Sequence, residues 1–455
     1  MARVSGQNDY DERVRDAPTP RSQKMTIPKM FEITQSFPPS MALDIPAAVR
    51  EQFKKSGVLG QITPGMRIAV GVGSRGISDL SKIVKAALEV LAGAGAKPFI
   101  VPAMGSHGGA TPDGQTRVLA EYGVTAETMG VPVDARMDVR KIGEALGGRD
   151  VVWSVAALEA DAVVAINRVK PHTDFHGPMG SGIQKMLAIG FGKQVGANLA
   201  HQAAVREGYL EAFCDYARVA LENVPVLCGV AIVEDQHHQT AEIEVLPKND
   251  IVIGEARLIK RAAEMLPRLP LDEVDLLIVD EMGKEISGTG MDTNVIGREI
   301  HGYSSLLSGN GHAAGDGSSV GRSVTVHRLL VCSLTEMSKG NGTGIGLADF
   351  ATKRLVNALD LRTTYMNALT SLGVQTPKIP IYFDTDREAV EQALATLATR
   401  RPERLRVVRI ANTLRLEKML VSESCAEALR DRPDIAISKA AEEMRFDREG
   451  NLMPL

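Results

Sequence analysis

The chain of 455 residues has few aromatic side chains and almost no excess of charge of either sign. Phe, Trp and Tyr make up 4% of the residues, which argues against a surface that stacks nucleic-acid bases. The formal net charge of −4 provides no attraction to nucleic acids or to anionic lipid surfaces. We therefore expect neither a nucleic acid nor a membrane as a partner.

Cysteine is also scarce, and long apolar runs are missing. The four cysteines lie far apart and form no CxxC pair, which argues against a zinc ribbon or a disulfide scaffold and fits a reducing compartment. No run of about 18 apolar residues is present, so no transmembrane helix is predicted. Residues 1–25 are polar with mixed charge and lack the apolar centre of a signal peptide. We expect a flexible N-terminal tail on a soluble, cytoplasmic protein.

Short apolar runs alternate with helical patterns along the chain. Residues 67–72 (RIAVGV), 97–103 (KPFIVPA) and 161–169 (DAVVAINRV) have the composition of buried strands. Between the first two, residues 79–96 carry apolar side chains at helical spacing, with Ser78 as a candidate cap. This alternation predicts an α/β fold whose mostly parallel sheets are covered on both faces.

The length predicts two domains. We place an N-terminal α/β domain, with the catalytic and cofactor-binding residues, at 26–268, and a C-terminal α/β domain at 269–455. The division rests on a second series of strand and helix patterns that starts near LLIVDEMGK and includes a long helix predicted over 346–361. Residues 303–320 are rich in Gly and Ser and predict a mobile loop. We expect the active site in the cleft between the domains.

Ligands of open α/β sheets bind at the carboxyl ends of the strands. The loops after three predicted strands carry Arg75, His107 and His172, and His176 follows in the last loop. An arginine before a helix can bind a carboxylate or a phosphate, although a single loop arginine or histidine is more often an ordinary surface residue. Taken together they indicate a site, because the chain has only nine histidines.

Two further residues follow in the same region. Lys185 lies between the glycine-rich GPMGSG and the apolar MLAIGFG. Its side chain either extends to solvent, which is commoner, or is desolvated and nucleophilic. His201, on a predicted helix, is either a buried histidine bonded to a backbone carbonyl or a metal ligand.

The order of these motifs resembles the lactate racemase family, the nickel-pincer-nucleotide-dependent racemases and epimerases of 2-hydroxy acids. The motifs are GSRG, GSHGG, PH, a lysine before MLAIG, and a histidine sixteen residues later. The similarity extends from about residue 60 to about residue 420. SGTGMDTNVIGR and GIGLADFATKRLVNALDL look like a subgroup of homologues rather than lactate racemase itself.

The resemblance implies a role for each residue. Lys185 would carry the cofactor, pyridinium-3,5-bisthiocarboxylic acid mononucleotide nickel, through a thioamide bond. His201 would complete the coordination of the nickel. His107 and His172 would be the catalytic acid/base pair, and Arg75 would lie near the substrate and the cofactor.

The resemblance also implies partners and further binding residues. Ser106 and Gly182, in the GSHGGAT and GSGIQK loops, would help hold the cofactor phosphate. His176, Lys284 and Arg298 are candidates for contact with the substrate, and Asp292 and Asn294 are polar neighbours of the last two. Enzymes of cofactor biosynthesis would supply the nickel-pincer nucleotide, and a homo-oligomer stays open.

This chemistry suits a 2-hydroxy acid. The hydrogen on its carbinol carbon is very weakly acidic, because the neighbouring carboxylate is already charged. Removing that hydrogen as hydride, while a base takes the hydroxyl proton, avoids a carbanion. Mirror-image substrates place the hydroxyl on opposite sides of a fixed hydride acceptor, so two bases are needed.

Two features leave the substrate and the reaction open. The segment between His172 and Lys185 is a few residues longer than in better-known members, and a glycine follows His107 where those members often have arginine. A larger hydroxy acid, such as a sugar acid, is therefore as good a candidate as lactate. One alternative is a divalent-metal hydrolase or lyase that uses His107, His172, His176 and Asp174. The other is a non-catalytic protein that binds a hydroxy acid.

Overall fold

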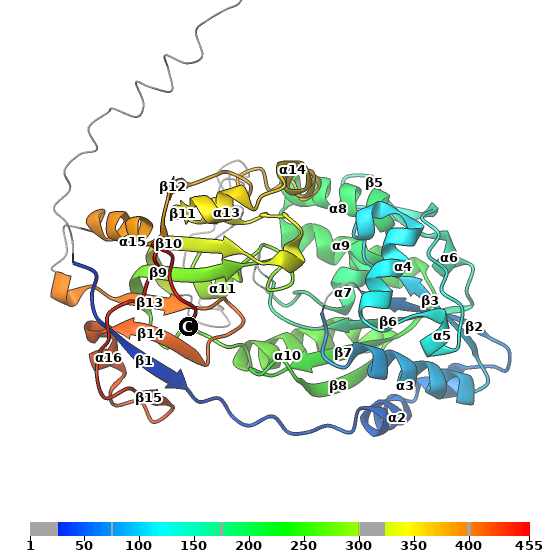
Figure 1. Cartoon of the computed structure of the whole chain (residues 1–455). Coiled ribbons are helices and arrows are strands. Elements are labelled where there is room, and N and C mark those ends of the chain that lie inside the picture. The colour runs from blue at the N-terminus through cyan, green and yellow to red at the C-terminus, as the bar shows by residue number, and fades with distance from the viewer. Residues whose placement is uncertain are drawn as a thin grey trace, which may run out of the picture.

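The computed structural model describes residues 26–73, 76–172, 175, 177–298, 300, 324–397 and 402–455. Arg75, Asp174, His176, the tail at 1–25 and the Gly/Ser-rich stretch at 303–320 lie outside the described residues. Two sheets form the centres of two halves of the molecule (Figure 1). The first sheet has the order β3-β2-β6-β7-β8, and the second has the order β12-β11-β10-β9-β13-β14-β1-β15.

Parallel strands dominate the first sheet. Four strands are parallel, and only β8 is antiparallel. The bounds are β2 (Arg67–Val72), β3 (Lys97–Pro102), β6 (Ala162–Arg168), β7 (Val226–Glu234) and β8 (Thr240–Pro247). The first three match the strands predicted from the sequence, and the α/β fold class is confirmed.

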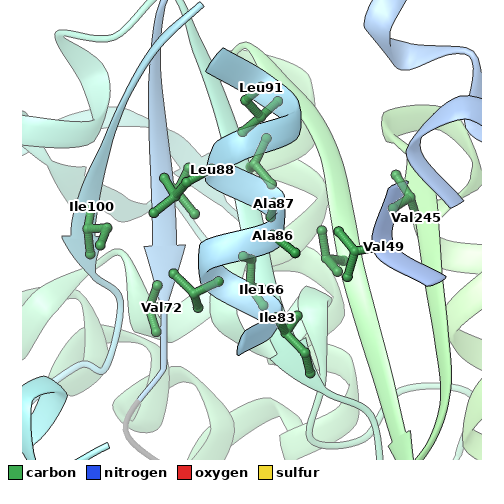
Figure 2. Close-up of a cluster of buried hydrophobic side chains, with 14 of the residues drawn as sticks. Val49, Val72, Ile83, Ala86, Ala87, Leu88, Leu91, Ile100, Ile166 and Val245 are labelled. Atoms are coloured by element: carbon green, nitrogen blue, oxygen red, sulfur yellow. The ribbon is translucent and has the colours of Figure 1, made fainter. Parts of the chain in front are cut away.

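Both faces of the first sheet are buried, as predicted. Ile68, Val70 and Val72 point from β2 into a core shared with the helices α2 (Ile45–Ser56) and α3 (Leu80–Gly93). Figure 2 shows Val72 and Ile100 in this core together with Leu88 and Leu91 of α3. Alternate side chains of the same strands, such as Ala69, enter a second core on the opposite face. The period of two along a strand thus supplies both cores.

Further helices and a hairpin surround this sheet. The hairpin consists of β4 (Val139–Ala145) and β5 (Arg149–Ser154). The helices are α4 (Pro112–Glu121), α5 (Ala126–Met129), α6 (Val155–Leu158), α7 (Ile183–Lys185), α8 (Lys193–Glu207), α9 (Tyr209–Asn223) and α10 (Ile251–Glu264). No helix within the described ranges is long and apolar enough to cross a membrane.

The second sheet is mixed. Five of its strands are parallel: β9 (Glu273–Met282), β10 (Thr325–Leu334), β11 (Phe350–Thr352), β12 (Ile381–Phe383) and β13 (Val407–Ile410). Antiparallel pairing adds β14 (Lys418–Ser422), β1 (Met30–Gln35) and β15 (Ile435–Ile437). The helices on this side are α11 (Thr293–Ile296), α13 (Lys353–Asn357), α14 (Leu361–Thr370), α15 (Asp386–Ala395) and α16 (Glu423–Leu429).

The first strand of the described chain, β1, belongs to the second sheet and not to the first. After β1 it runs along the edge of the molecule to α2 (Figure 1). Residues 30–35, which we had assigned to the N-terminal domain, therefore pair with strands from the other end of the chain. The division of domains at 268/269 stays a prediction.

The long helix predicted over 346–361 is wrong. Phe350 and Ala351 lie in β11, where they pair with Leu330 and Val331 of β10. Thr352 then caps α13, since its Oγ1 accepts a hydrogen bond from the backbone N–H of Leu355 at 3.3 Å. Burial of β11 between two parallel strands outweighs the helical tendency of the surrounding sequence.

One short segment lies against the first sheet with almost no space between them. The ring of Phe191 packs on Gly71 of β2, where an added Cβ would lie 2.1 Å from the ring Cζ. Ile183 packs on Gly229 of β7, where an added Cβ would lie 2.7 Å from the Ile183 Cγ2. The two glycines thus allow residues 183–191 to lie directly on the strands.

We predict that Gly71→Ala lowers the free energy of unfolding by about 1–3 kcal/mol, because the new methyl group overlaps the Phe191 ring. Gly60→Ala is the control, since an added Cβ there meets no atom within 4 Å. Its effect should stay within about 0.5 kcal/mol. Urea titration measures both, and equal effects would contradict the close packing.

Candidate active site

The loop after β6 brings two of the predicted site residues together. Lys170 and Ser181 exchange two backbone hydrogen bonds, of 2.8 and 2.9 Å, which close the loop at its base. His172 lies at the start of this loop and Lys185 one helical turn beyond its end. The Lys185 Nζ is hydrogen-bonded to the His172 Nε2. His172 is only 4% exposed, so this contact lies inside the protein.

A widened helical turn follows Lys185 directly. The N–H of Phe191 donates to the carbonyl of Met186, five residues earlier, at 3.1 Å. Two other parts of the chain donate hydrogen bonds to carbonyl groups of this turn. The Trp153 indole donates to the Leu187 carbonyl at 2.9 Å, and the Gly105 N–H donates to the Gly190 carbonyl at 3.1 Å. Such π-helical turns are frequent at functional sites. Here the turn joins the segment of Lys185 to β5 and to the loop after β3.

Aromatic rings link His172 to His201. The His172 ring stacks on Phe175 with centroids 4.2 Å apart. Phe175 meets the edge of Phe213 at 5.9 Å, and His201 meets the same ring at 5.6 Å. Tyr209 lies 6.5 Å from His201 and 6.4 Å from Phe175. The structure therefore places Lys185, His172 and His201 in one region.

The backbone fixes the tautomer of His201. Its Nδ1 is 2.6 Å from the carbonyl oxygen of Ala197, one turn earlier in α8. A carbonyl can only accept, so Nδ1 carries the hydrogen and Nε2 carries the lone pair of the neutral ring. A histidine held in this way through one nitrogen is suited to bind a metal through the other. The sequence left open whether His201 bonds a backbone carbonyl or binds a metal, and this geometry is compatible with both.

His107 lies in the loop after β3, and its side chain is exposed. A buried polar chain holds this loop. Gln115 donates to the carbonyls of Gly105 and His107 at 2.9 and 3.3 Å. Lys193 in turn donates to the Gln115 Oε1 at 3.0 Å and to the carbonyl of Pro102 at 2.7 Å. The helix of His201 is thereby tied to the loop of His107.

Lys193 is fully buried, and burial lowers the pKa of its ammonium group to about 8. Its backbone also has a φ of 53°, which is unusual for a side chain of this size. A buried cation at such a position costs stability unless it is fully bonded. The bonds to Pro102 and Gln115 offset this cost where the loop of His107 begins.

The sheet order sets the separation of the two predicted catalytic histidines. Their loops follow β3 and β6, and β2 lies between these strands. Neighbouring strands are roughly 4.8 Å apart, so the two strand ends are separated by about 10 Å. This distance applies to the strands from which the two loops start.

Ser106 and Gly182, the predicted phosphate contacts, lie in the two loops just described. Ser106 is half-buried beside His107. Gly182 precedes the helix of Lys185, and its carbonyl accepts a hydrogen bond from the Asn167 side chain at 2.8 Å. Their role toward a phosphate stays a prediction.

Two predicted substrate residues bond within the second half. Lys284 donates to the Asn367 Oδ1 at 2.7 Å. Arg298 forms an ion pair of 2.7 Å with Asp349, which also accepts a hydrogen bond from the backbone of β10. These bonds anchor the second sheet, and they do not place either cation at the loop of His172.

Asp292 of the second half contacts the base of this loop. Its Oδ2 lies 3.7 Å from the Nζ of Lys170, two residues before His172. The Asn294 side chain and backbone both donate to the other Asp292 oxygen, at 2.9 and 3.0 Å. The sequence named Asp292 and Asn294 only as polar neighbours and did not single out Lys170.

The described residues include one group of metal-ligating side chains, and it is not the predicted histidine cluster. Glu273, Asp275 and His327 offer ligand atoms within 4.8 Å of one another. They lie where β9 and β10 begin, at the amino ends of the strands. The guanidinium of Arg406 already contacts the Glu273 and Asp275 carboxylates, at 2.7 and 3.5 Å.

Sequence analysis missed Glu255, a fully buried residue of α10. Its Oε2 accepts a hydrogen bond of 2.9 Å from the backbone of Gln184, next to Lys185. Burial raises the pKa of the Glu255 carboxyl to about 7. A signal existed, because Glu255 shares the apolar face of its helix with Leu258, Ile259 and Ala262.

We predict that Glu255 makes the protein less stable as the pH rises. Its carboxyl has a pKa of about 7 when folded and an ordinary value of 4.5, so between these values the folded state binds the proton more tightly. The stability is full below about pH 4.5 and is lost as the pH rises through about 7. The loss should be roughly 3 kcal/mol.

Urea titrations at about pH 5 and about pH 8 measure this loss. Glu255→Gln should remove it. Glu264→Gln, at the exposed end of the same helix, is the control and should keep it. Equal pH dependence in wild type and Glu255→Gln would contradict the prediction.

Comparison with known proteins gives one family match. Residues 10–209 match the family described as the lactate racemase N-terminal domain. Similar solved structures include a protein from Thermotoga maritima, with 12% identity over 73% of this chain and 81% of that chain and a TM-score of 0.46. They also include the lactate racemase apoprotein from Thermoanaerobacterium thermosaccharolyticum, with 14% identity over 78% and 97% and a TM-score of 0.42.

No curated protein matches the sequence. The structural scores are low, so the assignment rests on the matched residues. These residues span Arg75, His107, His172, Lys185 and His201. Residues 10–209 of this chain are thus similar to the lactate racemase N-terminal domain.

Proposed function

We propose that this protein racemises or epimerises a 2-hydroxy acid, using a nickel-pincer nucleotide attached to Lys185. The observation that carries the proposal is the contact between Lys185 and the buried His172 at the carboxyl edge of a parallel sheet. His201 lies in the same aromatic cluster. A nucleophilic amine, an acid/base group and a metal ligand are the three functions that such an enzyme needs.

The residues fit the cofactor. Lys185 provides the amine for attachment, at the end of a short helix held against the sheet. His201 offers Nε2, and imidazole nitrogen is a suitable ligand for nickel. Ser106 and Gly182 would contact the phosphate group of the cofactor. When bound, the cofactor supplies a hydride acceptor for the carbinol carbon of the substrate.

The protein itself moves the hydroxyl proton. A neutral His172 accepts it from one enantiomer and His107 from the other, because the loops of β6 and β3 lie on either side of β2. Inversion is complete when the opposite histidine, in its protonated form, donates a proton to the keto oxygen as the hydrogen returns to the other face. The rings of Phe175 and Phe213 exclude water next to His172.

The substrate carboxylate needs a cation. Arg75 is our first candidate, since Arg298 is paired with Asp349 and Lys284 is bonded to Asn367. His176 is a second candidate, in the lengthened loop. A substrate larger than lactate, such as a sugar acid, stays a candidate, although Gly108 itself packs against the backbone of Gly114, where an added Cβ would lie 2.5 Å from the carbonyl carbon.

We predict that loss of either catalytic histidine slows turnover. In enzyme produced with the cofactor-building enzymes, His107→Gln and His172→Gln should each lower kcat by roughly 10²–10⁴-fold, because each removes one general base. His237→Gln is the control. His237 bonds the backbone of Pro38 and contacts Phe37, and it should keep full activity.

A panel of single enantiomers of 2-hydroxy acids in D₂O provides the measurement. Racemised product should carry no deuterium on the carbinol carbon, because the hydrogen returns as hydride. Deuterium on that carbon, or full turnover by both histidine variants, would contradict the mechanism.

A second prediction separates metal binding from attachment. His201→Ala should lower the nickel content of loaded protein at least about tenfold, because it removes a protein ligand. The mass added to Lys185 should remain. Elemental analysis and peptide mass spectrometry measure the two quantities, and unchanged nickel content would exclude His201 as the ligand.

A further inference from the structure

A buried carboxylate touches the helix that carries Lys185. Glu255 is fully buried, and its side chain extends from α10 to the first turn of α7. Its Oε2 accepts the backbone N–H of Gln184 at 2.9 Å. The first N–H groups of a helix have no partner within the helix, so a carboxylate there satisfies a donor and stabilises the positive end.

The carboxylate also touches the backbone just before this helix. A Cβ added at Gly182 would lie 2.7 Å from both the carboxyl carbon and the Oε1 of Glu255. Only glycine leaves room for this contact. The Gly182 carbonyl is bonded by Asn167 of β6 at 2.8 Å. The start of the helix is thereby held between β6 and α10.

This arrangement costs stability. The Oε1 of Glu255 has no hydrogen-bond partner among the described residues, and a buried carboxylate with an unsatisfied oxygen is unfavourable. An apolar side chain of similar volume would pack against the same neighbours at a lower cost. What it would not provide is the acceptor for the N–H of Gln184, one residue before Lys185.

We propose that Glu255 is a positioning residue: its carboxylate fixes the first turn of the Lys185 helix and so keeps the Lys185 amine against His172. The importance of that amine rests on the proposed function, whereas the geometric role of Glu255 does not. Glu255 lies outside the matched residues 10–209, so the family comparison assigns it no role. The α10 helix thereby contributes to a site whose lysine and histidines lie within the matched residues 10–209.

Hydrogen exchange of the full chain, without cofactor, tests the proposal. Glu255→Leu and Gly182→Ala should speed the exchange of the amides of residues 183–187 at least about tenfold. Glu255→Gln should stay close to wild type, because its amide oxygen still accepts the N–H of Gln184. Glu264→Leu, at the exposed end of α10, is the matched control.

Peptides of α3 distinguish positioning from general loosening. We expect the exchange of the α3 amides to be unchanged in the variants. A loss of global stability would instead speed the exchange of the α3 amides as much as that of the amides of residues 183–187. Unchanged exchange at 183–187 in Glu255→Leu, or equal acceleration throughout the chain, overturns the proposal. If Glu255→Leu does not fold, Gly182→Ala provides the test, again through the exchange of residues 183–187 compared with that of α3.

Cofactor loading provides the second readout. When the variants are produced with the cofactor-building enzymes, the fraction of Lys185 that carries the added mass should fall in Glu255→Leu and recover in Glu255→Gln. A wild-type protein without any added mass would overturn the proposed function and leave the exchange result as it stands. Full loading of Glu255→Leu with unchanged exchange would remove Glu255 from the site.

Discussion

The close packing of residues 183–191 on the first sheet is the constraint on which the site depends. Gly71 and Gly229 lack the side chains that would hold this segment away from β2 and β7. Phe191 and Ile183 occupy the space and fix the segment at two points. Interiors pack this tightly only when neighbouring side chains match in shape, so the segment has little freedom to shift. Lys185 lies between the two points and takes its position from them.

Buried polar groups around this segment form hydrogen bonds that fix the orientation of the neighbouring loops and helices. Lys193 holds the loop of His107 to the helix of His201, and Glu255 holds the start of the Lys185 helix. Each buries an ionisable group in a place where an apolar residue would be more stable. Hydrogen bonds have a preferred geometry, whereas apolar contacts fix position less strictly. The molecule thus gives up stability for precise placement beside one edge of one sheet.

Periodicity predicted much of the first half of the fold. The strands at 67–72, 97–103 and 161–169 and the burial of both faces follow from composition and spacing alone. A rule about strand ends predicted His172 at this edge of the sheet, whereas its contact with Lys185 and the loop closure by Lys170 and Ser181 are visible only in the structure. Local patterns suffice where neighbours in sequence are also neighbours in space.

Long-range pairing accounts for the failures. The helix expected over 346–361 contains β11, because its partners come from elsewhere in the chain. Similarly, β1 pairs with strands nearly 400 residues later. A charged residue such as Arg298 looks available for a substrate until its partner, Asp349, is seen in space. The apolar face of α10 marks Glu255 as buried, but its contact with the backbone of Gln184 joins residues 71 positions apart and is visible only in the structure.

The most direct test is to map the mass of the Lys185 peptide in wild-type protein made together with the cofactor-building enzymes, and to measure its nickel content. The account predicts that the added mass is on Lys185 and that each chain holds about one nickel ion. An unmodified Lys185 in protein that nevertheless turns over a substrate would contradict it.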